Sequence, residues 1–139
     1  MQLKTTLFLI SLLLLAGCRS TQEAEFVSVA SLAQSQYASL VPKWLPPNAE
    51  AIKIKEDKST HEFILRFEFS RPQVFPPPAP NCRQTKRPLR INPPMGASWW
   101  PSDIESSLAS YLELIYDCGT EGILLMRGLP EKTTAYFWR

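Results

Sequence analysis

The residues best suited to covalent chemistry are three cysteines, Cys18, Cys82 and Cys118. A thiol can be acylated, can pair in a disulfide or can bind a metal. Cys18 closes a segment in which the basic Lys4 precedes an apolar run over residues 7–15. A positive start, an apolar run and small residues before a cut are the layout of an exported precursor. Because a membrane-spanning helix needs roughly 20 apolar residues, the shorter run favours a signal peptide.

The residues around the cut, Leu15-Ala16-Gly17-Cys18, resemble the lipobox of bacterial lipoproteins. This resemblance implies that residues 1–17 are removed and that the thiol of Cys18 carries the lipid. Several acyl chains hold a protein firmly on a membrane, whereas a single chain binds only marginally. Arg19 stands where an aspartate would favour the inner membrane. The resemblance therefore implies the inner leaflet of the outer membrane, facing the periplasm.

Once Cys18 is assigned to lipid, Cys82 and Cys118 remain as an even pair in an oxidising compartment. We predict that they form a disulfide, which closes a loop of about 37 residues and contributes roughly 4 kcal/mol in the chain-entropy model. The single histidine, His61, does not stand at ligand spacing from either cysteine. We therefore predict no metal site and no cofactor.

His61 and a few carboxylates are the remaining candidates for acid–base chemistry. His61 falls in a predicted hairpin, and nothing in the sequence places a serine or free cysteine beside it. Asp103 and Glu105 are explained by the start of a helix, while Glu113 and Asp117 alternate on one strand face and are expected to be solvated. No nucleophile elbow, zincin motif or phosphate loop is present in the sequence. An envelope hydrolase acting on peptidoglycan or esters is thus the alternative function, not the first.

Length and charge narrow the classes of function. The chain has 139 residues with 15 basic and 13 acidic side chains, and this near balance argues against nucleic acid as a partner. After the lipidated cysteine and a polar tether over residues 18–25, the sequence predicts a single periplasmic domain over 26–139.

Period-two alternation of apolar and polar residues predicts most of the secondary structure. The first two predicted strands form a hairpin. The third also has helical spacing, but its aromatic content favours a strand. The five predicted strands span residues 51–56, 63–69, 111–118, 123–127 and 133–138.

Two helices are predicted between the strands. Helical spacing of apolar residues indicates an amphipathic helix over 29–40, with Ser28 as its N-cap. A capping box of Ser102 and Glu105 begins a second helix, which ends near Ser110. The sum is an α+β fold with an antiparallel sheet of about five strands, two short helices and a long proline-rich loop.

That loop covers residues 72–94, which hold eight of the thirteen prolines. Proline fixes φ and removes a backbone donor, so the segment forms neither a helix interior nor a central strand. It is either an arm that binds a partner or a structural excursion stiffened by proline and by the disulfide. The adjacent tryptophans either both cover the open edge of the sheet or leave one exposed. The candidate contact residues are Pro76, Pro77, Pro78, Arg83, Arg87, Trp99 and Trp100.

The mature part resembles a group of small proteobacterial lipoproteins. The resemblance rests on five motifs, Trp44 to Ile52, Leu65 to Phe69, Trp99 to Pro101, Tyr116 to Cys118 and Tyr136 to Trp138. It implies one periplasmic domain and adds no mechanism. We expect a membrane-anchored, non-enzymatic binding or accessory protein, such as an inhibitor, an immunity factor or an envelope-assembly component with an envelope protein as partner. A mainly structural role in the envelope is a third interpretation.

Overall fold

The computed structural model describes residues 20–86, 95–101 and 113–139. Over these ranges the chain forms one antiparallel sheet of seven strands, with one short α-helix, α2, at Val29–Ala33. The strands are β1 (Thr21–Ser28), β2 (Glu50–Asp57), β3 (Glu62–Phe69), β4 (Arg83–Gln84), β5 (Glu113–Asp117), β6 (Ile123–Leu129) and β7 (Lys132–Trp138).

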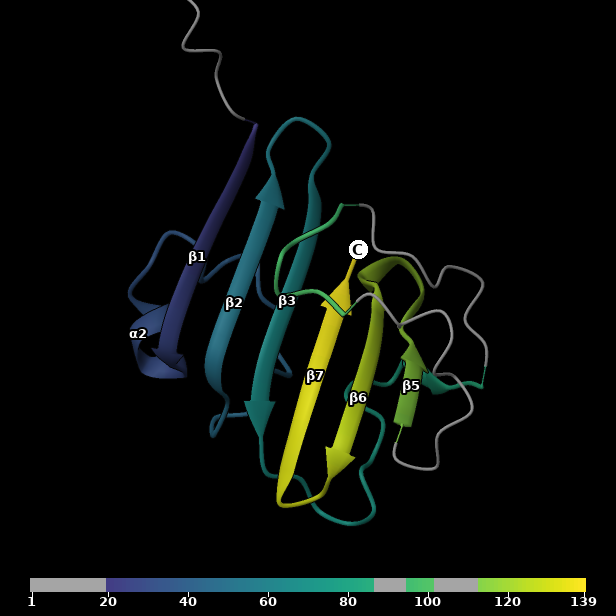
Figure 1. The fold of residues 1–139 in the computed structure, drawn as a ribbon. Coiled ribbons are helices and arrows are strands. Elements are labelled where there is room, and N and C mark those ends of the chain that lie inside the picture. Colours follow the sequence, from purple (N-terminus) through teal and green to yellow (C-terminus); the bar gives the residue numbers. More distant parts are fainter. Residues whose placement is uncertain (1–19, 87–94, 102–112) are drawn as a thin grey trace, which may run out of the picture.

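The order of strands across the sheet is β1-β2-β3-β7-β6-β5-β4 (Figure 1). The first three strands fill one half of the sheet in chain order. The last strand, β7, lies in the middle, paired with β3 on one side and with β6 on the other. All these pairs are antiparallel, so the sheet joins the two halves of the chain through its C-terminal strand.

Each face of the sheet buries its own apolar cluster, because successive side chains of a strand point to opposite faces. The core face carries the larger cluster, which includes Leu65 and Phe137. Parts of the segments 29–49 and 75–82 pack against it. Leu32, Tyr37 and Phe75 are among the side chains that these segments contribute.

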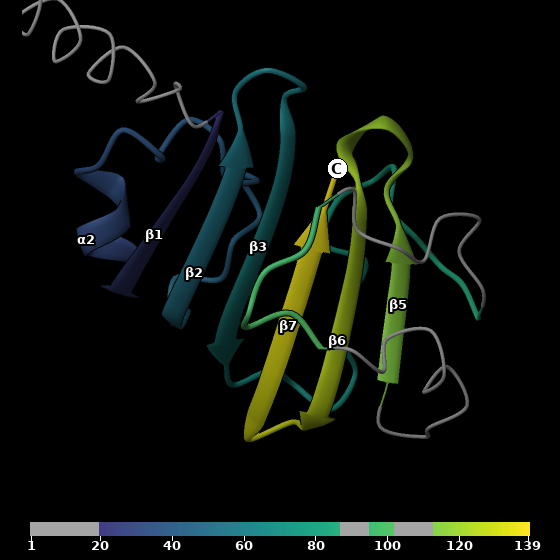
Figure 2. The same cartoon turned by 45° about the horizontal axis from the view of Figure 1, so that its top comes forward.

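The opposite face carries a smaller cluster around Ile64, Tyr136 and Trp138. Residues 95–101, which we call the strap, cross this face in front of β3 and β7 (Figure 2). We therefore call it the strap face. The ammonium group of Lys55 donates a 2.7 Å hydrogen bond to the carbonyl oxygen of Gly96 and so ties the strap to β2.

The predicted α+β fold with about five strands and two helices is wrong. The sheet has seven strands, and the described residues contain one α-helix of five residues. The two additional strands are β1 and β4. β4 has only two residues, too few for any alternation to appear in the sequence. The helix predicted from the Ser102–Glu105 capping box lies outside the described residues.

The helix predicted over 29–40 ends after Ala33. Its start is confirmed, because the side chain of Ser28 caps the helix and forms a capping box with Ser31. Its end comes early because the hydroxyl of Ser35 donates a 2.7 Å bond to the carbonyl of Leu32. Serine side chains compete with helical hydrogen bonding in this way. Leu32 is nevertheless buried against the core face, as its spacing predicted.

Residues 21–25, predicted to be part of a tether, instead form the first part of β1. Alternate residues of β1 turn towards the core face, where Ala24 and Phe26 pack. Glu23 and Glu25 lie on the strap face opposite Lys55 and Lys53 of β2. This stretch resembles a polar tether in the sequence because the lysines that pair with its carboxylates lie about thirty positions further along the chain.

The other predicted strands are confirmed, each with slightly different bounds. The hairpin of the first two predicted strands is β2 and β3, and the last two are β6 and β7. Residues 113–117 form strand β5 and not a helix, while 111–112 lie outside the described residues. The proline-rich segment is a loop as far as Cys82, then forms β4, and its residues 87–94 lie outside the described residues.

Candidate functional site

Cys82 and Cys118 form the predicted disulfide. Both are buried in the core-face cluster, and the bond joins the start of β4 to the end of β5. The amide of Asn81 adds a 2.9 Å hydrogen bond to the carbonyl of Cys118. The pair therefore acts as a structural staple between two segments. Cys18, the predicted lipid site, lies outside the described residues.

The staple closes one end of a loop over residues 70–82, which we call the proline loop. Phe75 anchors the middle of this loop, with its ring 5.9 Å from that of Phe69 and 6.1 Å from that of Tyr116. The hydroxyl of Tyr116 also donates a 3.0 Å hydrogen bond to the carbonyl of Phe75. Burial raises the pKa of that hydroxyl, while the nearby charge of Arg71 opposes the shift. The phenol therefore stays protonated and available as a donor.

The other end of the proline loop is bound to the turn between β6 and β7. The backbone amide of Arg71 donates a 2.8 Å bond to the carbonyl of Pro130. The hydroxyl of Ser70 donates a 3.0 Å bond to the carbonyl of Glu131. The guanidinium of Arg71 spans the junction, since it lies 3.3 Å from the carbonyl oxygen of Pro72 and 3.5 Å from that of Gly128. Two segments distant in sequence thus form one surface.

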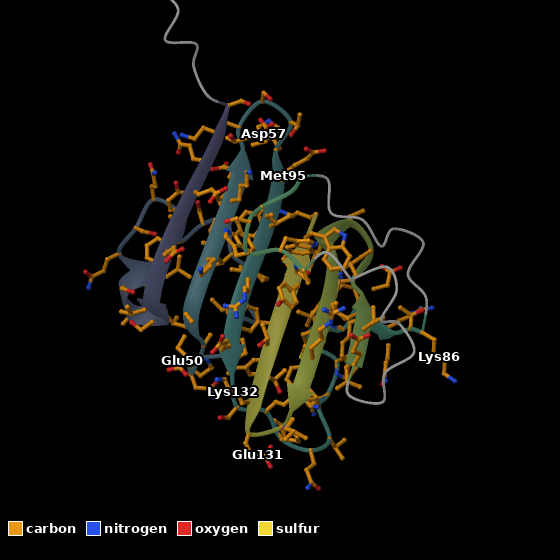
Figure 3. All side chains as sticks on the ribbon, in the orientation of Figure 1. Glu50, Asp57, Lys86, Met95, Glu131 and Lys132 are labelled. Atoms are coloured by element: carbon orange, nitrogen blue, oxygen red, sulfur yellow. A yellow bond between two sulfur atoms is a disulfide. The ribbon has the colours of Figure 1, made fainter. Side chains whose placement is uncertain are left out.

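Apolar side chains in these two joined segments face the solvent. Val74 is 85% exposed and Leu129 is 58% exposed, two of the three large hydrophobic residues that are exposed among those described. Pro76 and Pro77 follow Val74 and are also exposed. We call these four residues the distal pole. Figure 3 labels the neighbouring Glu131 at this lower end, opposite the hairpin tip at Asp57.

The predicted contact residues do not form one surface. Pro76, Pro77 and Pro78 belong to the proline loop, whose Phe75 packs on the core face. Trp99 and Trp100 belong to the strap and pack on the opposite face. Arg83 is exposed on β4, at one edge of the sheet. Arg87 lies outside the described residues. The sheet therefore separates the prolines from the tryptophans.

Both strap tryptophans are partly buried, so neither projects freely into solvent. Trp100 makes edge-to-face contacts with Tyr136 and Trp138, at centroid distances of 5.3 Å and 5.4 Å. Trp99 lies against Trp100 at 6.2 Å. They cover an apolar face of the sheet, which corrects the interpretation that both cover its open edge. Their role in this arrangement is packing.

The rest of the strap face carries charged side chains that form ion pairs with one another. Lys53 and Lys55 each lie 3.2 Å from a carboxylate of β1, and Arg66 lies 2.7 Å from Glu68. Burial alone would lower the pKa of Arg66, but the bond to Glu68 and the proximity of Tyr136 raise it overall.

Glu113, predicted to be solvated, has a side chain only 6% exposed and lies 2.7 Å from Arg127. The prediction for Glu113 was wrong because strand alternation shows which face a residue occupies but not how deeply that face is covered. This ion pair joins β5 to β6 on the strap face.

His61 lies at the exposed tip of the β2–β3 hairpin, with a left-handed φ of 61°. Within residues 20–86, 95–101 and 113–139, no three His, Cys, Asp or Glu side chains gather closely enough to hold a metal ion. In the same ranges, no helix has the length and apolar character needed to cross a membrane. Comparisons with protein-family models, curated proteins and solved structures found no match.

Sequence reasoning found the prolines of the distal pole but missed Val74 and Leu129. An isolated valine or leucine carries no signal, because single exposed apolar residues are common on protein surfaces. Leu129 lies between the predicted strands 123–127 and 133–138, and nothing in the sequence indicates that this link meets the proline loop.

Proposed function

We propose that this protein is a lipid-anchored, non-enzymatic binding protein of the bacterial envelope, and that it binds a protein partner through its distal pole. The observation that carries the proposal is the rigid presentation of exposed apolar residues at that pole. Val74 stands between Arg71 and Phe75, both of which are fixed by hydrogen bonds or ring contacts. A loop that is already ordered loses little entropy on binding.

The position of the pole supports the same proposal. Lipid on Cys18 would hold the chain at the start of β1, at the top of Figure 1. The β6–β7 turn with Leu129 lies at the other end of the strands. Eight residues of a strand span about 26 Å at 3.3 Å each. The distal pole would therefore face away from the membrane surface, towards proteins in the periplasm.

Site-specific photo-crosslinking of the full chain in living cells tests this proposal. A photoreactive residue at Val74 or Leu129 is expected to trap the same partner, seen as one adduct of a single mass. The control position is Lys58, which is exposed at the opposite end of the molecule. A partner trapped equally from Lys58, or no adduct from either pole position, would overturn the proposal.

The lipid anchor is tested separately by metabolic labelling with radioactive palmitate. The native chain is expected to incorporate label and to fractionate with the membranes. A Cys18→Ala variant that still carried label would refute the anchor while leaving the contact surface at the distal pole open to the crosslinking test.

A further inference from the structure

The outer side of β1 is an open edge of the sheet. Among the described residues, no strand pairs with it. The backbone amide of Lys58 donates a 2.9 Å bond to the carbonyl of Ser20, which fixes the phase of the β1–β2 ladder. Because backbone groups alternate in direction along a strand, the even-numbered residues bond to β2. The N–H and C=O groups of Thr21, Glu23, Glu25 and Val27 therefore point outward.

The two edges of the described sheet differ. β4, at the far side, has two residues and is held by the Cys82–Cys118 disulfide. Short strands are one way in which proteins keep an edge from pairing with other chains. β1 has eight residues, which is long enough to pair with another strand along its whole length. Of the two edges, β1 alone presents a continuous row of backbone donors and acceptors.

Charge on β1 restricts what can pair there. Glu23 and Glu25 have side chains 48% and 70% exposed, so each carboxylate keeps a solvent-facing side beyond its bond to β2. Like charges directly across a strand pair destabilise it, and opposite charges stabilise it. Two copies of β1 in antiparallel pairing about residues 23 to 25 would set glutamate against glutamate. The edge therefore disfavours a second copy of this chain and favours a basic strand.

The strand already paired with β1 shows what such a partner looks like. β2 places Lys53 and Lys55 opposite the two glutamates, while Ile52 and Ile54 pack on the core face. A partner on the outer side meets the same alternation of charge and apolar surface. It needs lysine or arginine at every second residue and apolar residues between them.

A hollow at the end of β1 offers space for one further side chain. The β2 register shifts between Glu50 and Lys53, where Ala51 has a left-handed φ of 48°. The irregularity leaves an open hollow of about 330 Å³, whose lining includes Glu25, Val27 and Ala51. Val27 is 80% exposed and lies at this hollow.

We propose that the outer edge of β1 binds an extended basic segment of another envelope protein by strand addition. In this arrangement the backbone groups supply the binding, and the charges of Glu23 and Glu25 select a segment with alternating lysine or arginine. The hollow beside Val27 takes an apolar side chain at the segment's end. This site is separate from the distal pole and goes beyond the function proposed for it.

A capped hexapeptide that alternates isoleucine and lysine is the probe, with a glutamate-for-lysine peptide as its control. Binding to the full chain in detergent is followed by the fluorescence anisotropy of the labelled peptide. The lysine peptide is expected to bind saturably, and the glutamate peptide is expected not to bind. Glu23→Gln with Glu25→Gln is expected to weaken binding about 2- to 30-fold, the range that two cross-strand charge pairs provide.

A matched pair of variants tests the backbone contribution. Glu23→Pro removes an outward N–H, whereas Glu23→Gln removes the same charge and keeps the N–H. Because proline is tolerated on the free side of an edge strand, the fold is expected to survive, which circular dichroism checks. Binding is expected to be lost with proline and only reduced with glutamine.

Three outcomes would overturn the proposal. They are no saturable binding at peptide concentrations up to about 1 mM, which corresponds to a weak affinity; equal binding of the two peptides; or equal affinity of the proline and glutamine variants. A Val74→Ser, Leu129→Ser variant is expected to bind the lysine peptide normally. Failure at the distal pole is thereby distinguished from failure at the β1 edge.

Discussion

Single residues decide how rigidly the proline loop is held. Tyr116 fills the core face, contacts the ring of Phe75 and bonds its carbonyl through one hydroxyl. The sequence predicted the disulfide because only two cysteines remain once Cys18 is assigned to lipid. It did not predict the role of Tyr116, because an aromatic residue on a strand has many possible neighbours and the fold chooses among them.

Replacing Tyr116 with phenylalanine is expected to remove the hydrogen bond to Phe75 and keep the ring packing. The free energy of unfolding is expected to fall by about 1 kcal/mol. Exchange of backbone amide hydrogens in the proline loop is expected to become faster, while exchange in β2 and β3 stays unchanged. Unchanged exchange in the loop would contradict this role of Tyr116.

The stability difference between the native chain and the Tyr116→Phe variant also depends on pH. Burial raises the pKa of Tyr116 in the folded chain, so the stability that this group contributes is fully present below the ordinary tyrosine pKa of about 10. That contribution is lost as the pH rises through the raised pKa. The difference in unfolding free energy between the native chain and the Tyr116→Phe variant is therefore expected to be constant near neutrality and to narrow above pH about 10. Denaturant titrations at pH 7 and above pH 10 measure it.

At the scale of elements, alternation predicted the strands whose two faces differ in character. β3 and β7 were predicted to within two residues because their apolar and polar positions alternate strongly. β1 was missed because its strap-face positions hold glutamates and a threonine, which are also typical of a tether. The helix was predicted to be too long because apolar spacing does not register the competition from Ser35.

The turn from β5 to β6 depends on one glycine. Gly122 has a φ of 130°, and a Cβ there would collide with the carbonyl oxygen of Trp138 and with the Phe137 ring at 2.8 Å. Both obstacles belong to the central strand β7. Gly122→Ala is therefore expected to destabilise the fold by at least about 2 kcal/mol, through backbone strain and overpacking together. Thermal unfolding measures the loss.

Gly119→Ala is the matched control for this prediction. Gly119 also has a positive φ, of 62°, but a Cβ there meets no atom within 4 Å. Its substitution is expected to carry only the smaller cost of the left-handed conformation, about 1 kcal/mol. Equal losses for the two variants would show that crowding against β7 contributes nothing.

For the whole molecule, sequence reasoning found parts of the candidate site but not their assembly. It singled out the prolines near Val74 and the tryptophans of the strap as one contact region, because they are close in the chain. The sheet lies between them. The proline loop is joined instead to the β6–β7 turn, which carries Leu129. Which residues share a surface depends on strand order, and the order β3-β7-β6 is not encoded in any local pattern.

The disulfide is expected to stabilise this assembly as a whole. Replacing both Cys82 and Cys118 with serine is expected to lower the free energy of unfolding by about 4 kcal/mol, the chain-entropy value for a loop of this size. Because both sulfurs are buried, mild reductant is expected to leave the folded native chain oxidised. Quantitative thiol labelling before and after denaturation checks this, and rapid labelling of the folded chain would contradict it.

The central place of β7 bears on when the chain can fold. β3 and β6 do not pair with each other. Each of them pairs instead with residues 132–138 of β7. The two halves of the sheet therefore stay separate until β7 has paired with both neighbours, so this one strand decides whether the sheet is completed.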